Sequence, residues 1–403
     1  MSGMLRGERN RRRRAVLGLT LLFALVDTAL ALAVLAPPGT EASPAATPMH
    51  PAASLFTPDG TQVSQCTDDA CFRQAFGNVA FREGPKAALD LVEEVYGEGG
   101  SPACHAVVHT VGAGALTRNG GDVARTFAEG SSICWSGYYH GIIERALLDA
   151  GGASTRAFRS VARTICSVAL ETMTPWIAYQ CLHGLGHGVM IATGIHLERS
   201  LAICKSTETR WERDACKGGV FMENISPSFG VSHWLREDDL IYPCNAVALE
   251  DRTRCYQMVT TRVLPAVGND WDEAATVCAG VETNFVQMCF RSLGRDASSN
   301  SGRDVETTIE SCIAARPYGG EASCIRAAAQ DVTANFTNGA RARPLCERVA
   351  PELASACFEG IGSVMGRFRK ATSARVSDCR SITADPALVD ACRRGGLSTL
   401  PRR

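Results

Sequence analysis

The sequence lacks the short motifs that identify several large groups of enzymes and cofactor proteins. It contains no His-Glu-x2-His, no Cys-x2-Cys-His, no Gly-x-Ser-x-Gly and no glycine-rich phosphate loop. Their absence argues against a zincin protease, covalently attached c-type haem and an α/β-hydrolase. The Glu-x2-His spacing of ferritin-like di-iron proteins is also missing. No segment shows the alternating pattern of a β-strand, so the sequence predicts an all-α protein.

Excess positive charge is also lacking. The first 36 residues hold six of the 41 basic and two of the 42 acidic side chains, which leaves 35 basic against 40 acidic residues in the remainder. Nucleic-acid-binding proteins carry a basic surface, so this mild acidity predicts no nucleic-acid partner.

The N-terminus predicts export. A cytoplasmic basic arm, residues 1–14, precedes a mostly apolar run at 15–36. A helix of that length spans a bilayer core of about 30 Å, and the arginines place its start in the cytoplasm. Asp27 interrupts the run, and a cleaved signal peptide ending near Ala29-Leu-Ala31 is the alternative. We expect a single-pass anchor in the cell membrane, with the rest of the chain extracytoplasmic.

Composition divides the exported part further. Residues 37–53 are rich in Pro, Ala, Thr and Ser and predict a linker. We expect a His-rich helical domain at 54–200, Cys-paired helical repeats at 201–396 and a short tail at 397–403.

The eighteen cysteines are the strongest regular feature. In an exported chain they predict disulfides, and zinc or iron–sulfur sites are the alternative, which the absence of Cys-x2-Cys disfavours. Seven pairs are separated by 11 to 15 residues: 166/181, 204/216, 244/255, 278/289, 312/324, 346/357 and 379/392. Cys66, Cys71, Cys104 and Cys134 allow three connectivities, of which 66–71 with 104–134 is favoured.

The second cysteines of these pairs recur every 33 to 39 residues. A period near 34 is typical of an α-solenoid of antiparallel helix pairs, and each disulfide would join the two helices of one pair. Glycines stand three residues after the cysteine at positions 137, 184, 219, 360 and 395. A glycine inside a helix costs about 1 kcal/mol relative to alanine, so their register predicts close helix packing.

These repeats resemble Sel1-type and tetratricopeptide-like repeats, in the form with a cysteine pair in each hairpin that occurs in exported bacterial proteins. The resemblance covers about residues 155–395 and implies the architecture only. The Trp, Tyr and Pro positions of the tetratricopeptide pattern are not met, so the resemblance implies no functional residues.

Histidines gather in one part of the chain. Five of the eight lie between residues 105 and 187, as His105, His109, His140, His183 and His187. Spacing of four puts both members of each His-x3-His pair on one helix face, and the His140–Glu144 pair has the same spacing. Equivalent helices of a solenoid stack side by side, so these side chains are expected to converge.

Converging imidazoles suit a zinc, copper or iron ion, or a non-covalent haem. The alternative is a metal-free network of hydrogen bonds in a polar core. Three functions stay open at this point. The protein binds a metal or haem, it is a metalloenzyme with Glu144 or Glu223 as base, or it is a scaffold that binds a protein partner on the solenoid face.

Overall fold

The computed structural model describes residues 56–97, 103–149, 160, 164–227, 232, 234–369 and 371–397. The expected anchor at 15–36 and linker at 37–53 lie outside these residues, as does His233. Within the described part of the chain the secondary structure is helical throughout and contains no strand, which confirms the all-α prediction. No described helix is both long and apolar enough to cross a membrane.

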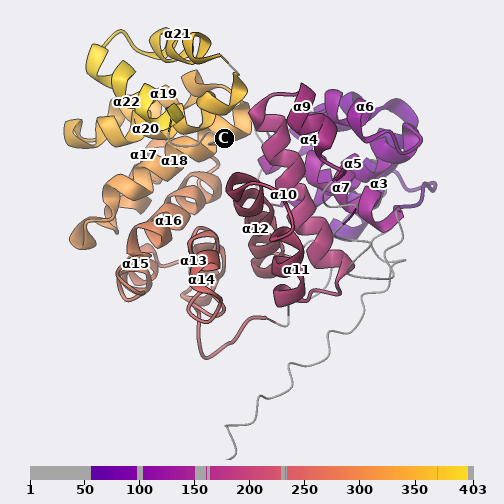
Figure 1. Ribbon diagram of the computed structural model, residues 1–403, viewed down its shortest axis with the longest axis horizontal. Helices are drawn as coiled ribbons and strands as arrows, with labels where there is room; N and C mark the ends of the chain where they lie inside the picture. The colour runs from indigo at the N-terminus through magenta and orange to yellow at the C-terminus, as the bar shows by residue number, and fades with distance from the viewer. Residues whose placement is uncertain are drawn as a thin grey trace, which may run out of the picture. The chain divides into compact units, whose positions relative to one another are not determined.

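Nine of the described helices form what we call the long row: α3 (Asp69–Glu83), α5 (Cys104–Arg118), α7 (Gly137–Asp149), α10 (Pro175–Ala192), α12 (Arg210–Ile225), α16 (Val286–Asn300), α18 (Glu321–Phe336), α20 (Pro351–Phe368) and α22 (Pro386–Leu397). Each contacts the next, from α3 to α12 and again from α16 to α22. Figure 1 shows the second series, α16 to α22, with its helices side by side.

The other helices link these elements: α4 (Pro85–Tyr96), α6 (Val123–Ala128), α9 (Ser167–Thr172), α11 (Leu197–Cys204), α13 (Leu249–Tyr256), α14 (Thr260–Ala266), α15 (Trp271–Ala279), α17 (Val305–Ile313), α19 (Arg343–Arg348) and α21 (Thr372–Ile382), with four short 3-10 helices, η1 (Val63–Gln65), η2 (Cys134–Ser136), η3 (Arg316–Tyr318) and η4 (Gly339–Ala342). Many of the described helices, in the long row and outside it, begin at a residue whose side chain accepts a backbone N–H. Asp122 does so for α6, Thr174 for α10 and Asp304 for α17. Such caps satisfy otherwise unpaired donors at the helix start.

The structure contains nine disulfides, and seven of them join the cysteines that the spacing paired. Cys66 bonds to Cys71 and Cys104 to Cys134, which selects one of the three connectivities. In the C-terminal series each bond joins a short helix to the long helix that follows it, as Cys278 of α15 joins Cys289 of α16. The disulfide prediction is confirmed.

The pattern changes between α12 and α16. Cys244 lies in a series of turns rather than in a helix, and its partner Cys255 lies in α13. The segment that corresponds to a long helix is split into α13 and α14, with Pro265 inside the second. Both short helices contact α16, so they connect the two series of the long row.

One helix starts later than its pattern indicates. The periodicity predicts a helix over 134–149, but Cys134, Trp135 and Ser136 have positive φ angles of 52°, 54° and 62°, and α7 begins at Gly137. The Trp135 indole donates to Asp331 Oδ1 at 2.6 Å, and Cys134 is bonded to Cys104. These long-range contacts hold the segment in the left-handed region, which side chains other than glycine rarely adopt.

Candidate metal centre

Four consecutive helices of the long row bring the predicted site residues together. His105 and His109 lie on α5, His140 and Glu144 on α7, His183 and His187 on α10, and Glu223 on α12. Of these seven side chains six are buried, and His105 is partly buried. The predicted convergence of the histidines is therefore what the structure shows.

Glycines let these helices approach closely enough for the side chains to meet. A Cβ added at Gly141 of α7 would lie 1.8 Å from the His109 carbonyl oxygen, and one at Gly219 of α12 would lie 1.9 Å from the His183 oxygen. No side chain fits in such a gap, so only glycine allows this backbone spacing. Gly184 and Gly219 belong to the register noted in the sequence, whereas Gly141 does not.

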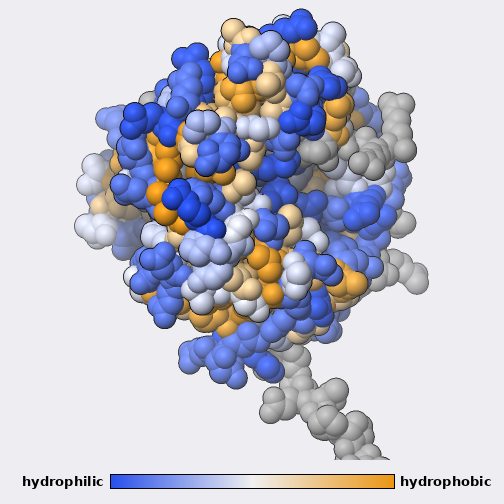
Figure 2. All heavy atoms as spheres, turned by 90° about the vertical axis from the view of Figure 1, so that its left-hand side faces the viewer, coloured by the Kyte–Doolittle hydropathy of each residue, from blue (hydrophilic) through white to orange (hydrophobic). Residues whose placement is uncertain are grey.

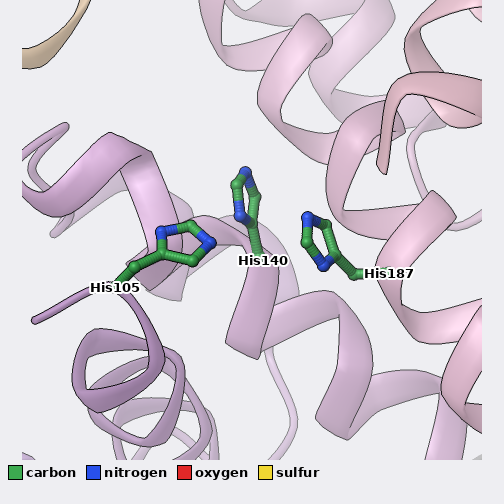
Figure 3. Close-up of side chains that lie close together, drawn as sticks. All are labelled: His105, His140 and His187. Atoms are coloured by element: carbon green, nitrogen blue, oxygen red, sulfur yellow. The ribbon is translucent and has the colours of Figure 1, made fainter. Parts of the chain in front are cut away.

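Three histidines face one another: His105, His140 and His187 (Figure 3). Each offers a ring nitrogen within 4.8 Å of the others. The rings of His140 and His187 are stacked, with centroids 4.8 Å apart, and the His105 ring lies 5.4 Å from that of His140. We call these three residues the histidine trio.

A protein acceptor engages one nitrogen of each ring in the trio. His105 Nδ1 lies 2.8 Å from the Cys134 carbonyl oxygen, His140 Nε2 lies 3.3 Å from Gln180 Oε1, and His187 Nδ1 lies 2.8 Å from Glu223 Oε2. Because these oxygens accept, the histidine nitrogens donate, and the opposite nitrogen of each neutral ring keeps its lone pair. An acceptor at the outer nitrogen is the usual support of a metal-binding histidine.

Several of the remaining polar atoms lack hydrogen-bond partners. His140 Nδ1, His183 Nδ1 and His187 Nε2 are buried and make no hydrogen bond within the described structure. His105 Nε2 lies 3.1 Å from His109 Nε2. A buried polar atom without a partner costs about 1–3 kcal/mol, so three of them in one cluster need an explanation.

A second group, adjacent to the trio, shares His187 and adds His109 and Glu144. Glu144 Oε1 lies 2.9 Å from His109 Nδ1 and 4.0 Å from His187 Nδ1, yet it makes no hydrogen bond in the described structure. His187 Nδ1 also contacts Glu223, so one imidazole is placed between two carboxyl groups.

The cluster favours neutral imidazoles. Burial, together with the neighbouring histidine, lowers the pKa of His105 to about 3, and burial lowers that of His109 to about 4. Burial also lowers the pKa of His140, His183 and His187 well below the usual histidine value. Burial and the nearby Glu223 raise the pKa of Glu144 well above its usual value. Neutral imidazole is the form that binds metal ions.

His183 occupies the edge of the cluster. Its ring centroid lies 4.9 Å from that of His140 and 5.2 Å from that of His187, and its ring stacks on Tyr179. It belongs to neither group of ligand-capable residues that the described structure contains. His196 lies outside the cluster, where it caps α11 and contacts Trp234.

Sequence reasoning missed two of the three acceptors. Gln180 directly precedes Cys181 and was not singled out, and a carbonyl oxygen such as that of Cys134 leaves no trace in sequence. The third acceptor, Glu223, is a residue that the sequence predicts as a candidate base, and its carboxylate contacts His187.

Two cavities reach the cluster. One of about 220 Å³ is lined by His140 and His183, and a larger one of about 630 Å³ is lined by His105. The cluster is therefore accessible to small molecules from two cavities.

Comparison with known proteins finds no family model, no curated protein and no solved structure that matches the chain.

Proposed function

We propose that the protein is an exported metal-binding protein in which His105, His140 and His187 hold one transition-metal ion. The observation that carries the proposal is the hydrogen bonding of the trio: one nitrogen of each ring donates to a protein acceptor, the other nitrogens of His140 and His187 have no partner, and that of His105 contacts only His109 Nε2, at 3.1 Å. A metal-free network should instead pair its buried nitrogens, and His140 Nδ1 and His187 Nε2 are unpaired in the described structure.

The spacing supports a bare ion over haem. Ligand atoms within 4.8 Å of one another can surround one ion, whereas a porphyrin would have to separate them. Imidazole suits zinc, copper and iron alike, so the histidines do not choose among these metals. Three histidine ligands leave one position of a tetrahedral ion open, as in catalytic zinc sites.

A metalloenzyme is the second candidate, and the two cavities beside the cluster favour it. An open coordination position next to a cavity is what metal-assisted hydrolysis requires. In this proposal Glu223 supports His187 through a 2.8 Å contact, and Glu144, whose pKa is raised by burial and by Glu223, is the better candidate for a base.

Nine disulfides support an oxidising, extracytoplasmic location. We propose that residues 15–36 anchor the chain in the cell membrane by a single helix, as the basic arm and apolar run indicate.

We also propose that the long row is an α-solenoid related in architecture to Sel1-type repeats. The period near 34 residues and the contacts of each long helix with the next support this.

A protein partner on the solenoid face remains the alternative function without metal. The face in Figure 2 is mostly hydrophilic, with apolar side chains scattered between polar ones. Among the exposed apolar side chains of the described residues are Ile313 and Tyr318, which are 39% and 41% exposed. The part of the surface visible in Figure 2 therefore does not favour a large apolar interface.

Elemental analysis tests the proposal. The full-length protein, purified from an oxidising compartment in detergent, should carry a stoichiometric amount of zinc, copper or iron. His187→Ala should remove it, because His187 belongs to both ligand-capable groups. His196→Ala is the matched control and should keep the metal. Wild-type protein that carries no metal and takes up none would leave the interaction scaffold as the function.

A further inference from the structure

Arginines line the smaller cavity together with two residues of the histidine cluster. Its wall contains His140 and His183, and also Arg254 of α13, Arg291 and Arg295 of α16 and Arg367 of α20. Arg254 lies close enough to His183 to lower the pKa of that imidazole, though burial and other histidines contribute more. The cavity therefore joins the two series of the long row.

Two of these arginines have no carboxylate to balance them. Arg254 lies 3.4 Å from Asp214 and Arg295 lies 2.7 Å from Asp296. Among the described residues, Arg291 and Arg367 form no ion pair; Arg291 Nη2 donates to Gln330 Oε1 at 3.3 Å, and Arg367 lies over the Tyr179 ring at 4.6 Å.

The Nε atoms of Arg291 and Arg367 are also without a hydrogen-bond partner. Both atoms are buried in the described structure. A guanidinium presents its donors as a rigid fork that matches the oxygens of a carboxylate or phosphate. Unused donors on two neighbouring forks mark a place where such a group can bind.

The positive charges of Arg291 and Arg367 in the cavity wall are not neutralised by a carboxylate of the described residues. Burial and the nearby Arg326, Arg254 and Arg367 lower the pKa of Arg291 to about 10, so it stays charged at neutral pH. Holding like charges in a partly buried site is unfavourable unless an anion is bound there.

Acidic residues in the cavity wall do not balance these arginines. Of the described residues that line it, only Asp331 is acidic. Asp331 accepts from the Trp135 indole at 2.6 Å and from Ser298 Oγ at 2.9 Å, and it pairs with Arg303 at 3.5 Å. Its oxygens are therefore already in use.

The larger cavity adjoins this one. Trp135, Met222, Met258 and Arg295 line both, and the larger has a volume of about 630 Å³. Its wall includes Leu264, Pro265 and Trp271. It can hold an apolar part of a molecule whose acidic group binds at the arginines.

We propose that these cavities bind a small organic acid or phosphate monoester, with its carboxylate or phosphate on Arg291 and Arg367 and its apolar part in the larger cavity. The acidic group would lie in the cavity that His140 and His183 also line. The inference does not require the proposed metal ion, because it rests on the arginines alone.

Calorimetric titration of the full-length protein tests this, with and without prior removal of metal by a chelator. The probes are phenyl phosphate, octanoate, inorganic phosphate and, as a non-oxyanion, chloride. The two organic anions should bind the metal-free protein, and Arg291→Gln should weaken them about tenfold or more, the usual effect of losing hydrogen bonds to a charged group. Arg348→Gln is the control, since Arg348 is exposed and pairs with Glu306 on the surface.

Folding of the variants is checked by circular dichroism and thermal unfolding. Arg291→Gln removes a charge that neighbouring arginines repel, so the ligand-free variant should melt no lower than the wild type. Arg291→Lys keeps the charge but not the fork and should bind with intermediate affinity. Arg367→Gln provides a second, independent variant with the same expectation as Arg291→Gln.

Three results would overturn the proposal. Equal affinity of Arg291→Gln, Arg367→Gln and Arg348→Gln for the organic anions would show that the arginines do not bind them. Binding confined to metal-loaded protein and independent of both arginines would make the anion a ligand of the metal, while the metal proposal would stand. Inorganic phosphate binding as tightly as phenyl phosphate would remove the larger cavity from the site.

Discussion

The two series of the long row share one scaffold and differ in the polar groups that they bury. A Cβ at Gly186 of α10 would lie 2.0 Å from the Cys216 oxygen, and one at Gly294 of α16 would lie 1.9 Å from the Cys324 oxygen, so the same close packing occurs in both. In both series a disulfide ties a short helix to a long one, as Cys204–Cys216 and Cys312–Cys324 do.

Buried carboxylates of the C-terminal series such as Asp296 have partners in the protein, while the Nε atoms of Arg291 and Arg367 do not. Asp296 accepts from Thr260 at 2.7 Å and from Arg295 at 2.9 Å. The cluster on α5, α7 and α10 instead keeps imidazole nitrogens without a hydrogen-bond partner on His140, His183 and His187. Both series therefore position side chains by the same helix packing. Buried polar groups that have hydrogen-bond partners in the protein are structural, whereas those without partners are candidates for binding a ligand.

The largest expected effect comes from removing close helix contacts. Gly141→Ala would place a Cβ 1.8 Å from the His109 oxygen, and Gly362→Ala would place one 1.8 Å from the Cys392 oxygen. Backbone atoms cannot yield easily, so we expect each to lower the free energy of unfolding by about 3 kcal/mol or more. Denaturant unfolding measures this.

The two glycine variants should differ in metal content. Gly141→Ala separates α5 from α7 and should lose the metal, whereas Gly362→Ala lies in the other series and should keep it. Gly60→Ala is the control, since its Cβ would meet nothing within 4 Å. Equal metal loss in both glycine variants would show that the series are not independent.

Removal of single disulfides should have the next largest effect. Replacing both cysteines by serine at Cys104–Cys134 or at Cys278–Cys289 should each cost about 3 kcal/mol by the loop-closure argument. The first bond also fixes the Cys134 carbonyl that accepts from His105, at 2.8 Å. Metal content should therefore fall in the first variant and stay unchanged in the second.

Acidification should destabilise the series that contains the histidine cluster more than the other series, and this effect should be smaller than those above. In the metal-free protein the pKa of His109 is about 4 and that of His105 about 3 in the folded state, against about 6.5 unfolded. Because the folded pKa values are lowered, the unfolded state binds more protons as the pH falls below 6.5, and stability is lost down to the folded values. The raised pKa of Glu144 acts in the opposite direction and offsets part of the loss.

Hydrogen exchange with mass spectrometry measures this locally. Exchange in α5, α7 and α10 should speed up between pH 7 and pH 5, after correction for the intrinsic rate. Residues 255–395 contain no histidine and should not follow the same change. A uniform response of both series would contradict the assignment of this pH dependence to the cluster.

Much of the scaffold could be predicted from local sequence signals. Cysteine spacing predicted seven of the nine pairings, because a bond between consecutive segments of one repeat joins residues 11 to 15 apart. His-x3-His spacing placed both rings on one face, and the period suggested that successive helices would align them. The trio within the five histidines could not be chosen, because ring orientation depends on acceptors such as Gln180.

Contacts between distant parts of the chain were beyond prediction. Trp135 contacts Asp331, which lies 196 residues further on, and the Trp176 and Phe368 rings lie 5.3 Å apart. Such contacts depend on small rotations that accumulate from one helix pair to the next. For the same reason no sequence pattern placed Arg291 and Arg367 in the wall of the same cavity as His183.

The smallest effect is expected from a change of one atom at Glu223. In the wild type, His187 Nδ1 lies 2.8 Å from the Glu223 carboxylate. Glu223→Gln keeps an oxygen that can accept from this nitrogen but removes the negative charge that makes the imidazole more basic. Changes of this kind usually weaken metal binding by 10- to 100-fold, about 1.4 to 2.8 kcal/mol. Competition with a chelator of known affinity measures the change.

Glu359→Gln is the matched variant in the other series, where Glu359 of α20 lies 2.9 Å from Arg326. It should leave metal affinity unchanged. If Glu223 were instead a catalytic base, Glu223→Gln would keep full metal affinity and lose only turnover, because a base acts on a bound water and not on the histidine. A chelator titration that superimposes on the wild type would therefore move Glu223 from support of His187 to the chemistry of an enzyme.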